Sequence, residues 1–228
     1  MTAVLAVSLD GKIADRQRGA ARFGSPRDLA HLATVIATMD AVLVGSGTLR
    51  AYGTSLVIRD PELLEQRRAA GRSPQPVHLI CSPSGQLNPQ WRFFQQPFPR
   101  WLLTTATGAA AWGDRPGFER QIQIPQDPPW FWPKILATLP LHLPPGQSRL
   151  RLGLLGGSSL VTAFLGQGCL DELHLTFCPL LLGGQSAVSL VGGAGFLECY
   201  APRLQLLDMK AVDSEIFAHY RVADRGRK

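Results

Sequence analysis

The sequence has 228 residues, of which 45% are hydrophobic and 18% are charged. This length suffices for one large domain or two small ones. Ordinary hydrophobicity with low charge excludes a disordered chain, and four widely separated cysteines exclude a disulfide scaffold. No apolar run is long enough to span a bilayer, and the amino-terminal residues lack the pattern of a signal peptide. We therefore expect a cytoplasmic location.

The net charge of +6 suits an anionic partner such as a phosphorylated metabolite or a phosphate-rich cofactor. The basic residues are dispersed, and their one dense group is Arg67, Arg68 and Arg72. Aromatic residues are not interleaved with this group. We therefore expect it to be a solvated face, and we do not expect a nucleic-acid partner.

Strand and helix signals alternate along the first half of the chain. Ser25-Pro26 and Asp60-Pro61 each combine a capping side chain with a proline suited to the first helical turn. Gly71 is suited to end the second of these helices. In chain order, the predicted elements are a strand at 3–8, a helix at 25–39, a strand at 41–44, a helix at 60–71, and strands at 77–81, 101–105 and 121–124.

The second half changes from mixed signals to strands. The predicted elements are a short helix at 135–139, a strand at 151–155, a helix at 160–165, a half-exposed strand at 173–177 and a hairpin of 204–209 with 215–222. This order predicts an α/β fold with a mainly parallel sheet and antiparallel strands added at an edge. We find no linker or repeat, so we expect a single domain over 1–228 with its core at about 3–222.

Two glycine-bearing turns follow predicted strands, at 44–48 and at 155–160. Glycines let a backbone approach a ligand closely, and a helix that begins there presents free N–H groups to an anion. Two such turns could hold both phosphate ends of a dinucleotide. A Gly-Gly turn also serves simply as a tight connection, and the sequence leaves both interpretations open.

Asp10 and Lys12 follow the first predicted strand directly. Asp10-Gly11 is a strong turn pair, so Asp10 could act only in fixing the turn. Alternatively, both charged residues lie at the mouth of a site, because open α/β sheets bind ligands at the ends of their strands. Asp10 and Lys12 are therefore the candidate catalytic residues.

Several common chemistries have no counterpart in the sequence. The P-loop, the nucleophile elbow and the zinc-deaminase pattern are absent, and so is the glycine fingerprint of a standard dinucleotide-binding fold. The five histidines are scattered without metal-ligand spacing, so we expect no metal site. The four cysteines are expected to be reduced, buried thiols.

Several of these motifs follow one another along the chain in an order that resembles that of a known protein family. They are Ser8-Leu9-Asp10-Gly11-Lys12-Ile13-Ala14, residues 40–48, residues 156–160, residues 170–173, Pro179 and Gly183-Gly184. The set resembles the reductase domain of riboflavin biosynthesis, the dihydrofolate-reductase-like domain at the C-terminal end of bifunctional deaminase–reductases. The resemblance covers nearly the whole chain and implies a three-layer α/β/α fold. The length leaves no room for the deaminase half.

The resemblance implies a reductase that uses NADPH. The ribosyl group of 5-amino-6-(5-phosphoribosylamino)uracil would be reduced to ribityl, with hydride passing from nicotinamide C4 to C1 of the sugar. The implied substrate contacts are Leu56 and Arg59. The implied or candidate cofactor contacts are Val7 through its backbone, Thr48, Arg50, Ser82, Gly156, Gly157, Ser158, Ser159 and Leu160. Of these, Arg50 and Ser82 are the candidates for a 2′-phosphate contact.

The chain departs from the family pattern at Ala20, Ile36, Tyr52 and Leu155, where the family has polar groups. Losing hydrogen-bonding groups weakens selection for a polar pyrimidine. Two alternatives therefore stay open: a reductase of another small molecule, and a nucleotide-binding oligomer without catalysis. We also expect a homodimer, because the predicted strand at 173–177 and the apolar segment 179–182 form an edge that needs cover.

Overall fold

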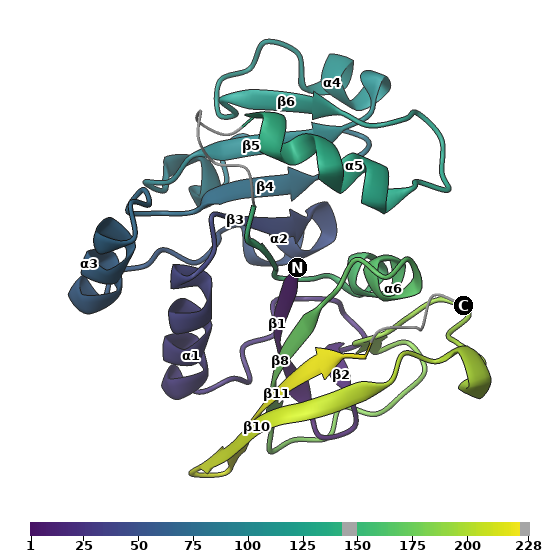
Figure 1. Ribbon diagram of the computed structural model, residues 1–228. Coiled ribbons are helices and arrows are strands. Elements are labelled where there is room, and N and C mark those ends of the chain that lie inside the picture. Colours follow the sequence, from purple (N-terminus) through teal and green to yellow (C-terminus); the bar gives the residue numbers. More distant parts are fainter. Residues whose placement is uncertain (143–149, 224–228) are drawn as a thin grey trace. The chain divides into compact units, whose positions relative to one another are not determined.

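The computed structural model, shown in Figure 1, describes residues 1–142 and 150–223. The chain divides into two compact units. The first unit comprises Met1–Leu32 and Leu154–Lys228, and the second comprises Ala33–Gly153. Helix α1 (Pro26–Ala37) and strand β7 (Leu152–Leu154) run across the division. The expected single domain over 1–228 stays a prediction.

The first unit contains four strands in the order β10-β11-β8-β1. Strand β1 (Thr2–Ser8) is parallel to β8 (Glu172–Cys178), and β8 is antiparallel to β11 (Glu215–Val222). Strand β10 (Leu204–Val212) pairs with β11 as the expected hairpin. Two short strands, β2 (Lys12–Ala14) and β9 (Val188–Ser189), form a separate pair. The remaining elements of this unit are helix α6 (Ser158–Gly166) and the single turn η3 (Glu198–Tyr200).

The predicted position of the exposed sheet edge was wrong. Strand β8 has a partner on each side, because β1 and β11 flank it. The edge of this unit is β10, whose Leu204, Leu206 and Met209 are exposed. Long-range pairing with the N-terminal strand, which local patterns do not reveal, moves β8 into the interior.

The side chains of β8 alternate between two chemically different faces. Leu173 and Leu175 are buried on one face, while Glu172, His174 and Thr176 share the other. The first turns of α1 cover part of the polar face, since the His31 ring lies 5.2 Å from that of Phe217 and 5.5 Å from that of His174, centroid to centroid. This unit therefore encloses a layer of titratable groups.

The second unit contains four parallel strands in the order β3-β4-β5-β6. They are β3 (Ala41–Gly45), β4 (Val77–Cys81), β5 (Arg100–Thr104) and β6 (Arg120–Gln123). Continuous burial of residues 41–44 is typical of a parallel strand covered on both faces. Its helical elements are α2 (Ser46–Tyr52), α3 (Pro61–Ala69), η1 (Arg92–Gln95), α4 (Ala106–Trp112), α5 (Trp132–Thr138) and η2 (Leu139–His142).

Helix α3 begins and ends as its sequence signals predict. The Asp60 carboxylate accepts a hydrogen bond of 2.8 Å from the backbone N–H of Glu62, and Pro61 occupies the first turn. Gly71 follows the helix with a φ of +70°, a conformation that glycine adopts at no steric cost. These local rules hold because both ends of the helix are set by residues adjacent in sequence.

The arginine cluster is not the solvated face that we expected. Arg67 is only 1% exposed, and its guanidinium donates hydrogen bonds to the carbonyls of Ala37, Met39 and Ser73. Arg67 thus satisfies carbonyls at the end of α1, which would otherwise lack partners. Burial is the first cause that lowers the pKa of Arg67 to about 10.

All four cysteines are free thiols. Cys81 and Cys178 are buried as expected, but Cys199 in η3 is exposed.

Among the helices of residues 1–142 and 150–223, none is both long enough and apolar enough to cross a membrane. Mostly parallel strands, helices between them and antiparallel C-terminal strands confirm the α/β class.

Candidate active site

The turn from β7 into α6 has the geometry of an anion site within the first unit. Gly156 has a φ of +96°, which side chains rarely allow, and Gly157 is the N-cap residue of α6. No described side chain caps this end of the helix. The first backbone N–H groups of α6 therefore remain available to a ligand, and the helix dipole favours a negative charge there.

The predicted residues of this turn differ in their access to a ligand. Ser158 and Ser159 are half-buried and exposed, respectively, in the first turn of α6, where hydroxyl groups can donate to a phosphate. Leu160 is buried. The N–H of Leu160 donates to the carbonyl of Gly157 at 3.0 Å, so Leu160 contributes packing and no free donor.

A second glycine-rich loop, which the sequence analysis missed, contacts α6. The N–H of Gly192 donates to Thr162 Oγ1 at 2.9 Å, and a Cβ atom at Gly192 would lie 2.7 Å from Ser158 Oγ. Gly193 and Gly195 have φ values of +70° and +71°. A side chain at Gly192 would therefore displace the Ser158 hydroxyl, and the three glycines within 192–195 were the available signal.

Asp10 is bound to a distant loop of the first unit. Its carboxylate accepts hydrogen bonds from Ser8 Oγ at 2.7 Å, Leu182 N at 3.0 Å and Gly183 N at 2.7 Å. The bonds from Ser8 and then Leu182 are the leading causes that lower the pKa of Asp10 to about 2. Asp10 is therefore ionised near neutral pH, and it positions the loop at Leu182 and Gly183. From the sequence we expected Asp10 either to fix its own turn or to take part in catalysis.

Lys12 lies in β2 and contacts the neighbouring strand. Its Nζ donates to Ser189 Oγ at 2.9 Å, and its backbone N–H donates to Ser8 Oγ at 2.9 Å. A cavity of about 280 Å³ is lined by Arg16, Gly183 and neighbouring residues. Because Gly183 belongs to the loop that Asp10 holds, Asp10 helps to shape this cavity, and Arg16 brings it a positive charge.

The remaining predicted contacts divide between the units. In the first unit, Val7 on β1 is 1% exposed, so it can offer only its backbone, as expected. In the second unit, Thr48 is half-buried and Arg50 is exposed on α2. Ser82 differs from expectation, because its side chain is fully buried and its Oγ has no hydrogen-bond partner among the described residues.

The predicted substrate contacts, and the positions that depart from the family pattern, differ in how far their side chains are buried. Leu56 is half-buried and Arg59 is exposed, both between α2 and α3. Ile36 is 1% exposed, so this position presents no group to a ligand. Tyr52 is exposed at the end of α2, and Leu155 is half-buried before the glycine pair. Ala20 is half-buried as well, so Ala20, Tyr52 and Leu155 are the departures that can alter contacts to a ligand.

The α/β fold and the uncapped helix after a glycine pair describe a scaffold with a candidate anion site, and the comparisons with known proteins give its family. The family model of the RibD C-terminal domain matches residues 1–218. The chain therefore belongs to the RibD C-terminal domain family, the reductase family of riboflavin biosynthesis, as its motifs predicted.

One curated relative and two solved structures illustrate this membership. An Archaeoglobus fulgidus protein named 2,5-diamino-6-ribosylamino-4(3H)-pyrimidinone 5′-phosphate reductase is 24% identical over 198 residues, which cover 85% of this chain and 86% of the relative. A pyrimidine reductase-like protein from Corynebacterium diphtheriae has a TM-score of 0.79 and 22% identity, with 98% of this chain and 91% of that chain covered.

The second solved structure is longer than the matched region. It is the diaminohydroxyphosphoribosylaminopyrimidine deaminase/5-amino-6-(5-phosphoribosylamino)uracil reductase of Thermotoga maritima, with a TM-score of 0.75 and 21% identity. The match covers 97% of this chain and 56% of that chain. The structural likenesses confirm the expected fold class, a dihydrofolate-reductase-like α/β fold.

Proposed function

We propose that this chain is an NADPH-dependent reductase of a ribosylaminopyrimidine 5′-phosphate. In the reaction the bond between C1 and the ring oxygen of the ribosyl group breaks, NADPH supplies a hydride to C1, and one proton from solvent is taken up, so that NADP⁺ and a ribityl group result. The observation that carries the proposal is the uncapped amino end of α6 behind Gly156 and Gly157, in a member of a family of pyrimidine reductases. A cytoplasmic location and a homodimer belong to the same proposal.

The residues at α6 fit a dinucleotide phosphate. Gly156 and Gly157 carry no side chain that would block the approach, and Ser158 and Ser159 add hydroxyl donors to the free backbone N–H groups. When bound, NADPH supplies the hydride from nicotinamide C4. The contributions of Thr48 and Arg50 on α2, and of Val7 through its backbone, are part of this proposal.

The protein's own task is to bind and orient the reactants. The ionised Asp10 holds the loop at Leu182 and Gly183 in place, and this loop lines the cavity that contains Arg16. A guanidinium suits a phosphate group, so Arg16 is proposed as a substrate contact in addition to Leu56 and Arg59, which the resemblance implied. Of the two candidate catalytic residues, Asp10 binds the loop, and Lys12 Nζ donates a hydrogen bond to Ser189 Oγ.

The substrate has two candidates that differ in one ring substituent. The Archaeoglobus relative is named for a 2,5-diamino pyrimidinone, whereas the Thermotoga protein is named for the corresponding uracil. We favour 5-amino-6-(5-phosphoribosylamino)uracil, which the family motifs first suggested. A different small molecule is the second candidate, because Tyr52 and Leu155 stand where the family has polar groups.

The test is NADPH consumption by the purified chain with each pyrimidine in turn, at saturating cofactor. Turnover of either pyrimidine supports the proposed class, and the ratio of the two kcat/KM values identifies the substrate. Absence of turnover with both pyrimidines contradicts the proposal. If NADPH still binds tightly in that case, the nucleotide-binding alternative is favoured instead.

A further inference from the structure

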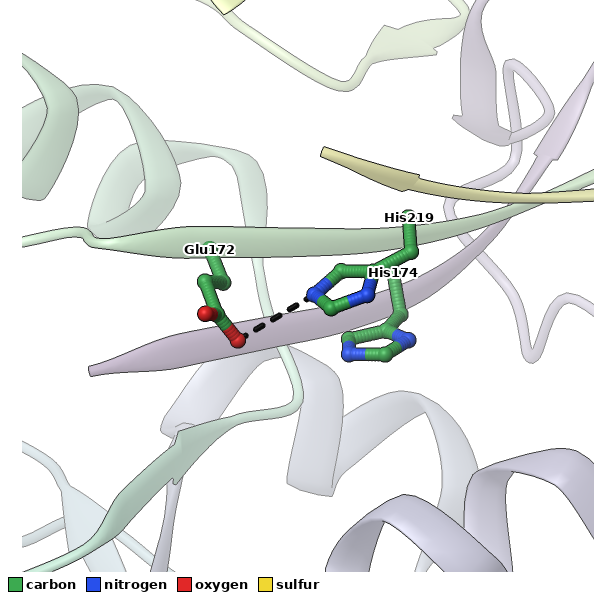
Figure 2. A group of neighbouring side chains, drawn as sticks. All are labelled: Glu172, His174 and His219. Atoms are coloured by element: carbon green, nitrogen blue, oxygen red, sulfur yellow. Dashed lines mark hydrogen bonds and ion pairs between the residues drawn. The ribbon is translucent and has the colours of Figure 1, made fainter. Parts of the chain in front are cut away.

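A cluster of metal-ligating side chains lies on the polar face of the first unit. Glu172 and His174 come from β8, and His219 comes from β11. Figure 2 shows the three side chains beside one another. One potential ligand atom of each residue lies within 4.8 Å of those of the other two. The histidines are scattered in the sequence, and the antiparallel pairing of β8 with β11 brings two of them together with Glu172.

The strand geometry explains why these residues meet. Glu172 and His174 are two positions apart on β8 and therefore point to the same face. His219 lies directly opposite His174 in the antiparallel register. Side chains opposite each other on paired strands are close neighbours. The backbone thus brings the three side chains together. The His174 and His219 rings stack with centroids 3.9 Å apart and planes inclined by 17°, so one imidazole must rotate before both direct a nitrogen at the same ion.

The surroundings keep the imidazoles available as ligands. The side chains of His219 and Glu172 are 26% and 33% exposed, so an ion can reach them from solvent.

We propose that Glu172, His174 and His219 form a binding site for a divalent transition-metal ion of the zinc type. Two imidazole nitrogens and one carboxylate oxygen are donors that zinc accepts. At bond lengths of about 2.0–2.2 Å, tetrahedral ligands lie about 3.4 Å apart. His219 Nε2 and Glu172 Oε2 form a hydrogen bond of 3.1 Å, so these two atoms must separate by only about 0.3 Å to reach this spacing. Three protein ligands leave a further coordination position for water.

A bound ion would connect two strands that are far apart in sequence. Because the unfolded chain does not preform the site, binding adds to the stability of the folded state by mass action. None of the three residues belongs to the proposed NADPH or substrate contacts. The site is therefore independent of the proposed reductase activity, and each can fail without the other.

The test is a titration of chelator-treated, full-length protein with CoCl₂ at neutral pH, followed by displacement with ZnCl₂. We expect one ion per chain, a visible absorption band of nitrogen- and oxygen-coordinated cobalt, and a rise in melting temperature with zinc. Glu172→Gln, which keeps shape and removes charge, and His219→Ala should each weaken zinc binding by at least about 10-fold.

His31→Gln is the matched control, because His31 contacts His174 but lies outside the set of three. It should retain zinc affinity within about threefold. Wild-type protein that takes up no cobalt, or affinity unchanged in both Glu172→Gln and His219→Ala, overturns the proposal. A loss in His31→Gln equal to that in His219→Ala overturns the three-residue assignment. Circular dichroism confirms that each variant is folded.

Discussion

The rings of His174 and His219 stack across two antiparallel strands, with centroids 3.9 Å apart and planes inclined by 17°. Two imidazolium ions would repel each other at this separation. Burial and these histidine neighbours lower the pKa of His174 to about 4, from an ordinary value of 6.5. The unfolded chain therefore binds this proton more readily, and stability declines as pH falls from about 6.5 to about 4.

Histidine resonances in an NMR titration should show His174 uncharged down to about pH 4. In His219→Gln, the charge opposite His174 is removed, so the pKa of His174 should rise toward its ordinary value. An unchanged pKa in this variant would assign the entire shift to burial. Wild-type His174 titrating at 6.5 or above would contradict the stacked arrangement.

Arg67 should be among the most sensitive charged positions of the second unit. In Arg67→Met, the carbonyls of Ala37, Met39 and Ser73 lose their donors, and each buried unpaired group is costly. We expect a loss of about 3 kcal/mol in the free energy of unfolding, measured with urea. The adjacent Arg68→Met removes an exposed ion pair with Glu65 and should cost less than about 1 kcal/mol. Equal effects would contradict the structure.

Asp10→Asn tests the connection between Asp10 and Gly183. An amide cannot accept the bonds that both carboxylate oxygens accept, so the variant should unfold at lower urea concentration near neutral pH. The pKa of Asp10 is lowered to about 2 in the folded chain, so its contribution is present above pH 3.8 and is lost as pH falls through about 2.

The two unfolding curves should therefore converge in strong acid. Asp208→Asn, which changes an exposed carboxylate on β10, is the control and should leave the urea midpoint unchanged. A stability difference between wild type and Asp10→Asn that persists unchanged at low pH would show that the carboxylate charge is not the cause.

Ser159→Asp separates helix stability from phosphate binding at α6. A carboxylate in the first turn of a helix stabilises it by about 0.3–1 kcal/mol through the dipole. The same charge repels a phosphate, so NADPH affinity should fall about tenfold, or about 1.4 kcal/mol. Ala106→Asp makes the equivalent change in the first turn of α4 and should leave the affinity unchanged. Fluorescence titration with NADPH measures both, and unchanged affinity in Ser159→Asp would exclude a phosphate at α6.

Local signals predicted much of the fold. Asp60, Pro61 and Gly71 set the ends of α3 because capping and turn rules act between neighbours in sequence. The alternation at 215–222 predicted β11 at its observed bounds. The sequence analysis did not predict helix α4, because Ala-Thr-Gly-Ala-Ala-Ala shows little apolar periodicity. The available signal was Thr105, whose side chain caps the helix by accepting a hydrogen bond from the N–H of Gly108.

Local sequence patterns did not predict the contacts between segments that are far apart in the sequence. Nothing near Arg67 indicates that it satisfies carbonyls thirty residues earlier. The strand register that places His219 opposite His174 is likewise a property of the sheet. At the site, the motifs identified the turn at Gly156 and Gly157, but the loop at Gly192 and the loop bonded to Asp10 required the folded chain.

The most direct test of the reductase assignment is the fate of the hydride. The chain is incubated with NADPH deuterated at nicotinamide C4 and with 5-amino-6-(5-phosphoribosylamino)uracil, and the product is analysed by mass spectrometry and NMR. We expect a ribityl product with one deuterium on the carbon that was C1 of the ribosyl group. Unchanged pyrimidine, or a product without deuterium at that carbon when the label is on either face of C4, would contradict it.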